Sequence, residues 1–122
     1  FKHINDTYGH DTGDSVLRRL AETIRNNLRN TDLLCRWGGE EFLALLPDSN
    51  TAGALVFAER LLDAVRSART DTAQNGAVTC SVSIGIAEMS DTGGDLDTLI
   101  SRADNALYQA KERGRDRIQC AT

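Results

Sequence analysis

Apolar residues recur every three or four positions in three stretches of the sequence, residues 11–30, 51–67 and 96–113. This spacing puts them on one face of an α-helix, so each stretch is predicted to form a helix with a core-facing stripe. Asp14 or Ser15 is expected to cap the start of the first helix. The predicted stripes consist of Val16, Leu17, Leu20, Ala21, Ile24 and Leu28, then Leu55, Ala58, Leu61, Leu62 and Val65, then Leu96, Leu99, Ile100, Ala103, Ala106, Leu107 and Ala110.

Two short apolar runs, Leu33–Trp37 and Phe42–Leu46, flank the segment Gly38-Gly39-Glu40-Glu41. Paired glycines between two such runs are typical of a β-hairpin, because tight hairpin turns need backbone with positive φ. We therefore expect two antiparallel strands that are joined at the glycines.

Residues 78–86 alternate between apolar and small polar side chains, which predicts a single β-strand with one buried face. The polar stretch 69–76 is expected to be a loop, Gly114 to end the third helix, and residues 117–120 to form a short last strand. The resulting order of elements favours an α+β fold, in which helices cover one face of a mostly antiparallel sheet in two layers.

Length and composition narrow the class of protein further. The 122 residues are enough for one domain, and 40% hydrophobic with 26% charged residues is typical of soluble globular proteins. A net charge of −4 lacks the basic excess of proteins that bind nucleic acids or anionic membranes, and no apolar run approaches the ~20 residues of a membrane span. Cys35, Cys80 and Cys120 have no metal-type spacing, so free thiols in a reducing cytoplasm are expected.

Glu40 and Glu41 follow the glycines at the predicted tip of the hairpin. Carboxylates suit Mg²⁺, which typically binds one or two of them together with substrate phosphates, and glycines let a bulky ligand approach the backbone. Successive strand residues point to opposite faces, so at most one of the two glutamates needs to face a ligand. Taken alone, the motif is more simply explained as a solvated acidic turn.

The segment from Asn5 to Asp14 carries side chains that can recognise a purine. An aspartate can accept hydrogen bonds from N1–H and N2–H₂ of guanine, and an asparagine can bond to O6 or N3. Loop and capping chemistry, which Asn, Asp and Gly commonly serve, is the simpler alternative for this segment alone.

Lys111 and Arg115 lie four residues apart near the end of the third predicted helix. This spacing places both side chains near one face of the helix end, where they could hold phosphate oxygens. The lysine would act as a point charge and the arginine as a fork. Favourable placement of cations at a helix C-terminus is the alternative.

Together these features resemble the GGDEF family of bacterial diguanylate cyclases, in the variant with glutamate at the third motif position. The resemblance runs across all 122 residues. It rests on Phe1-Lys2-His3-Ile4-Asn5-Asp6, Tyr8-Gly9-His10 with Gly13-Asp14, Gly38-Gly39-Glu40-Glu41-Phe42, Val82-Ser83-Ile84-Gly85-Ile86-Ala87, and Ala103-Asp104 through Lys111 to Gly114-Arg115.

The resemblance implies a ferredoxin-like, nucleotidyl-cyclase-like domain that joins two GTP molecules into cyclic di-GMP with Mg²⁺ or Mn²⁺. Two subunits would face each other, each presenting one metal-bound GTP. By the same resemblance, Glu40 is the expected metal ligand and base for the 3′-hydroxyl, with Glu41 in support. The implied substrate-binding residues are Asn5 and Asp14 for guanine with His10 beside them, backbone amides near Phe1 and Lys2 for phosphate, Gly38 and Gly39 at the bend, and Lys111 and Arg115 as phosphate clamps.

Arg29 and Asp32 form an Arg-x-x-Asp sequence that ends five residues before Gly38. In the family this motif at this spacing forms a product-inhibition site, where the arginine can stack on or fork to a guanine and the aspartate can accept from its edge. A surface salt bridge near a helix end is the alternative.

The family also carries an Asp-x-Asp on a first strand, directly upstream of the position that matches Phe1, and its first aspartate is a main metal ligand. The sequence begins after that segment, so residues 1–122 are expected to form a GGDEF domain that lacks its first strand. Without that strand, the domain is expected to be inactive. A sensory or dimerising module is expected upstream, where a membrane anchor could also lie. A catalytically silent module that binds GTP or cyclic di-GMP, or a dimerisation unit, are the alternatives to the enzyme.

Overall fold

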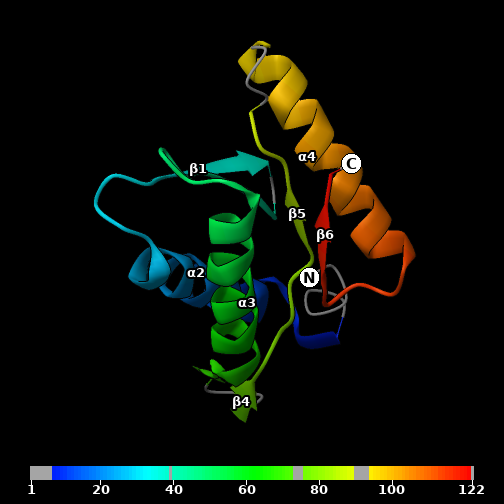
Figure 1. Cartoon of the computed structure of the whole chain (residues 1–122). Helices are drawn as coiled ribbons and strands as arrows, with labels where there is room; N and C mark the ends of the chain where they lie inside the picture. The colour runs from blue at the N-terminus through cyan, green and yellow to red at the C-terminus, as the bar shows by residue number, and fades with distance from the viewer. Residues whose placement is uncertain (1–6, 39, 73–75, 90–93, 122) are drawn as a thin grey trace. The chain divides into compact units, whose positions relative to one another are not determined.

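The structure is a computed structural model of the whole chain, and it describes residues 7–38, 40–72, 76–89 and 94–121 (Figure 1). Phe1, Lys2, Asn5 and Gly39 therefore lie outside the described residues. The elements are α2 (His10–Asn27), β1 (Leu33–Gly38), β2 (Glu41–Leu45), α3 (Thr51–Ser67), β3 (Thr70–Thr72), β4 (Gly76–Val78), β5 (Ile84–Ile86), α4 (Leu96–Glu112) and β6 (Ile118–Cys120). The fold is α+β, as the sequence predicts.

The chain divides into two compact units. The first comprises Phe1–Pro47 with Asp63–Cys80, and the second comprises Asp48–Leu62 with Ser81–Thr122. Helix α3 contributes residues to both units. None of the helices in the described part of the chain has the length and hydropathy that a membrane span requires.

Helix α2 supplies the core of the first unit. Val16, Leu17, Leu20 and Ile24 of its predicted stripe are buried, and Val16 packs with Val78 and the half-buried Cys80. Burial of apolar side chains is the main source of stability in such a unit.

The predicted cap of α2 is wrong. The helix begins at His10, its N-cap is Gly9 with φ 91°, and no side chain in the described part of the chain caps it by a hydrogen bond. Asp14 and Ser15 lie in the second turn, where the Ser15 hydroxyl donates to the carbonyl of Asp11 at 3.2 Å. A glycine with positive φ starts the helix in place of a capping side chain.

The strands that the structure describes in the first unit form two hairpins, of which the sequence predicts one. β1 and β2 pair antiparallel from Leu33 opposite Leu45 to Gly38 opposite Glu41, as expected. The predicted loop 69–76 is wrong, because it contains β3 and the first residue of β4, which form a second antiparallel hairpin with Thr70 opposite Val78. Its polar residues hide the strand, since they give no apolar alternation.

The predicted continuous strand 78–86 is also wrong. β4 ends at Val78, β5 begins at Ile84, and no ladder among the described residues covers 79–83. Val78 and Ile86 are both buried, so the alternation does indicate which residues face inward. A strand additionally needs a hydrogen-bonded partner along its whole length, which the pattern cannot reveal.

The second unit is built on a parallel pair, β5 with β6, along which α4 lies (Figure 1). Gly85 allows this close packing, because a Cβ there would overlap the Ala103 carbonyl oxygen and the Leu107 nitrogen of α4. The Asp95 carboxylate caps α4 by accepting from the Thr98 N–H at 2.7 Å. Gly114, with φ 117°, follows the last turn and ends the helix as predicted.

Candidate functional site

The hairpin β1–β2 carries the acidic residues at its turn. Glu40 is exposed within the turn, whereas Glu41 is half-buried at the start of β2, opposite Gly38. The ladder shifts register between Arg36 and Gly38. Such irregularities re-aim side chains and are frequent beside active sites. The hairpin therefore holds the two carboxylates in different environments, with that of Glu40 open to a ligand.

The residues at this turn fit a magnesium ion that also binds substrate phosphates. No group of three or more His, Cys, Asp or Glu side chains in the described part of the chain could hold a metal by itself. Mg²⁺ does not need such a cage, because it typically takes one or two carboxylates and fills its other positions with water and phosphate oxygens. Glu40 and Glu41 can supply those carboxylates.

His10 and Asp14 project from the beginning of α2. They are one helical turn apart, which places them on the same face, and both are exposed. Thr12 and Gly13 between them are buried, so α2 is anchored by its other side. The arrangement leaves the Asp14 carboxylate accessible to the edge of a base.

Lys111 and Arg115, the two candidate phosphate-binding residues, lie around the C-terminus of α4. Lys111 is in the last turn of the helix and half-buried. Arg115 lies beyond the helix with φ 62°, and its N–H donates to the Ala110 carbonyl at 2.9 Å. The helical i, i+4 argument for this pair is therefore wrong, because the chain leaves the helix at Gly114, before it reaches Arg115.

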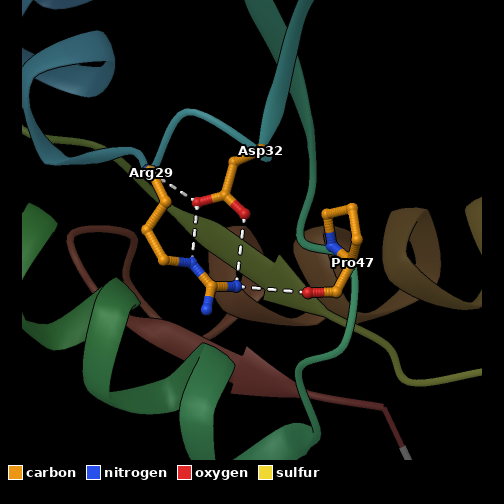
Figure 2. A network of polar contacts seen from close by, with 3 residues as sticks. All are labelled: Arg29, Asp32 and Pro47. Atoms are coloured by element: carbon orange, nitrogen blue, oxygen red, sulfur yellow. Dashed lines mark hydrogen bonds and ion pairs between the residues drawn. The ribbon is translucent and has the colours of Figure 1, made fainter.

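Arg29, Asp32 and Pro47 form a polar network (Figure 2). The Asp32 carboxylate accepts from the Arg29 backbone N–H at 2.8 Å, from Nε at 3.4 Å and from Nη2 at 3.3 Å. Nη2 also donates to the Pro47 carbonyl at 3.2 Å. Burial alone would raise the pKa of Asp32, but the hydrogen bonds and charge of Arg29 together hold that pKa below its ordinary value. The pair is therefore an ion pair in this structure.

The candidate residues divide between the two units. His10, Asp14, Arg29, Asp32, Glu40 and Glu41 belong to the first unit, and Lys111 and Arg115 belong to the second. The Pro47 carbonyl of the Arg29 network is not predictable from the sequence, since every residue has a carbonyl and no pattern marks this one. The same holds for Glu88, whose carboxylate accepts from the Thr51 N–H at 2.7 Å at the start of α3. Both contacts join residues that are far apart in the sequence.

Comparison with known proteins identifies the family. Residues 1–117 match the family described as "Diguanylate cyclase, GGDEF domain", and the chain belongs to this family. Diguanylate cyclase DgcM of Escherichia coli strain K12 is 44% identical over 121 residues, which are 99% of this chain and 28% of DgcM.

Two solved structures are similar over almost the whole chain. Diguanylate cyclase SiaD of Pseudomonas aeruginosa, in complex with its activator SiaC, has a TM-score of 0.91 at 41% identity, over 98% of this chain and 45% of that one. The GGDEF domain of DgcB from Caulobacter crescentus, in complex with c-di-GMP, has a TM-score of 0.90 at 32% identity, over 98% of this chain and 70% of that one. The chain thus spans little more than a quarter of DgcM and under half of SiaD.

Proposed function

We propose that residues 1–122 are the GGDEF domain of a diguanylate cyclase, which condenses two GTP molecules into cyclic di-GMP and releases two pyrophosphates. The observation that carries the proposal is the β1–β2 hairpin of a GGDEF-family chain, with Glu40 exposed at its glycine turn. Each 3′-hydroxyl attacks the α-phosphate of the other GTP, so the active form is a homodimer with one GTP on each subunit. Since its substrate is GTP, we place the domain in the cytoplasm.

Glu40 and Glu41 hold the divalent cation in this proposal. When bound there, Mg²⁺ or Mn²⁺ polarises the phosphoryl oxygens and lowers the pKa of the attacking hydroxyl. The exposed Glu40 carboxylate takes the proton from the 3′-hydroxyl, while the half-buried Glu41 supports the negative environment that attracts the cation.

Recognition of GTP falls to two further groups of residues. Asn5 and Asp14 bind the Watson–Crick edge of guanine, and His10 lies one helical turn from Asp14 beside the base. The phosphates are held by the backbone amides near Phe1 and Lys2, by the backbone of Gly38 and Gly39, and by Lys111 and Arg115. Catalysis beyond this is positioning of the two substrates, which is why dimerisation controls the rate.

Arg29 and Asp32 form the product-binding site that inhibits the enzyme. A relative of this chain, the GGDEF domain of DgcB, is known in complex with c-di-GMP. The side chain of Arg29 is 58% exposed, which suits stacking of its guanidinium on a guanine. A regulatory module or partner protein supplies the activating signal, as SiaC does for SiaD.

The test is product formation by the natural protein that carries this chain, supplied with GTP and Mg²⁺ and assayed by chromatography. Glu40→Gln keeps the shape of the side chain and removes its charge. We expect it to lower the rate at least about 100-fold, since even outer partners of a metal site contribute roughly 10–100-fold. The matched control is Glu59→Gln at an exposed position of α3, which should leave the rate unchanged.

Two results would contradict the proposal. Tight GTP binding by a folded wild-type protein without any cyclic product would make it a silent binding module. Equal rates for wild type and Glu40→Gln would remove Glu40 from the reaction.

A further inference from the structure

Arg29 bridges the two chain segments that leave the open end of the β1–β2 hairpin. Asp32 immediately precedes β1, and Pro47 lies two residues beyond the end of β2. The guanidinium of Arg29 donates to the Asp32 carboxylate and, through Nη2 at 3.2 Å, to the Pro47 carbonyl. Figure 2 shows both contacts made from the same side chain.

We infer that Arg29 is a clasp that closes the base of this hairpin, and is thereby a positioning residue for the glutamates at its tip. The contacts that Arg29 makes at the base of the hairpin are observed in the structure. The consequence of this clasp for Glu40 and Glu41 rests on the proposed function.

The environment of Asp32 favours the clasp over a loose surface pair. Its side chain is 3% exposed, whereas that of Arg29 is 58% exposed. Without the guanidinium, this carboxylate would lose its donors at 3.4 and 3.3 Å and keep the Arg29 backbone N–H at 2.8 Å. Its negative charge would then have lost the cation that pairs with it, which is costly for a side chain shielded from solvent. The Asp32 N–H also donates to the Arg29 carbonyl at 3.0 Å, so backbone and side chains close the same turn.

Among the described residues β1 and β2 pair only with each other, and a two-stranded hairpin is only marginally stable on its own, so contacts that fix its ends matter. The β1 face with Leu33 and Trp37 is open to solvent, with 61% and 56% of these residues exposed. Fixing the strand ends at the base therefore contributes directly to the order of the hairpin. A dinucleotide that recruited the Arg29 guanidinium would have to draw it away from these partners.

Hydrogen exchange of the wild-type protein and its variants tests the clasp without any nucleotide. In Arg29→Ala we expect the amides of 33–35 and 43–45 to exchange about fivefold faster, while Leu20 and Ile24 in α2 keep their protection. Fivefold corresponds to about 1 kcal/mol, the order of a partly exposed charged bridge. Arg29→Lys, which keeps the charge without the fork, should lie in between. The control Arg25→Ala, an exposed arginine in the last turn of α2, should match wild type.

Turnover tests the positioning role, with a phosphodiesterase present to remove cyclic product. Arg29→Ala should need a severalfold higher Mg²⁺ concentration for half-maximal rate, with partial rescue in Arg29→Lys. A residue that only binds the inhibitory product would leave this Mg²⁺ dependence unchanged.

The inference is overturned if hairpin amides exchange alike in Arg29→Ala and wild type, or if α2 amides accelerate equally. An unchanged Mg²⁺ dependence overturns the positioning role. If the wild-type protein forms no cyclic product, the proposed function fails, whereas the exchange result still decides the clasp.

Discussion

Gly85 is the position where a single added methyl group should do the most damage. It lies in the middle of β5, where α4 packs directly on the strand. An added Cβ would overlap the Ala103 carbonyl oxygen and the Leu107 nitrogen, and would lie 2.9 Å from the Leu107 Cα. These are backbone atoms of a helix, so they cannot rotate aside as the end of a flexible side chain could.

The cost of Gly85→Ala follows from this geometry. Overpacking in a core typically costs about 1–3 kcal/mol, and the value rises when a whole helix must shift. We expect a loss of about 3 kcal/mol, a large share of the roughly 5–15 kcal/mol that stabilises a domain. For a chain of this length, that corresponds to a fall in Tm of roughly 10 °C.

Thermal unfolding followed by circular dichroism measures the effect, with Gly53→Ala as the matched control. Gly53 lies in the first turn of α3, and a Cβ there would meet the Asn50 Oδ1 at 3.5 Å, an ordinary contact. Removing a helical glycine should raise stability by roughly 0.5–1 kcal/mol. If Gly85→Ala melted within a degree or two of wild type, the close approach of α4 to β5 would be refuted.

Two further predictions concern carboxylates of the first unit. Asp14→Ala should reduce discrimination for GTP over ATP about tenfold, since a lost hydrogen-bond partner costs ~1–3 kcal/mol. Equal affinities for GTP in the variant and the wild type would exclude a role of Asp14 in reading guanine. Because its pKa in the folded protein lies below the ordinary value of 3.8, Asp32 should stabilise the fold fully above that pH and lose this contribution as the pH falls through the lowered pKa. Urea midpoints between pH 7 and pH 2 measure this, and an acid limb equally steep in Asp32→Asn would contradict it.

The sequence predicts those parts of the fold that follow from local periodicity. The stripe through Val16, Leu20 and Ile24 is buried as expected, and α3 has the predicted bounds. The place of Leu96 in the predicted core stripe of α4 is wrong, because this first residue of the helix is 48% exposed. The pairing of strands is not local. The hairpin β3–β4 and the break after Val78 depend on which segments lie alongside one another, and that information is absent from apolar alternation.

The candidate site divides in the same way. Glycines and glutamates at a turn predict the hairpin that presents Glu40, because the turn imposes its own residue types. The path of the chain after α4 is harder to predict, since the left-handed backbone at Arg115 and Asp116, with φ 62° and 50°, is unusual for residues with side chains. Contacts made by carbonyls, such as that of Pro47 with Arg29, leave no trace in the sequence.

Trp37 gives the protein an optical reporter of its own. It is the single tryptophan of the chain, lies in β1 next to Gly38, and is 56% exposed. Within residues 1–122, intrinsic fluorescence excited at the indole therefore arises from one place, beside the bend that bears Glu40. Changes in its emission maximum or quenching would follow events at that bend in real time, without any label.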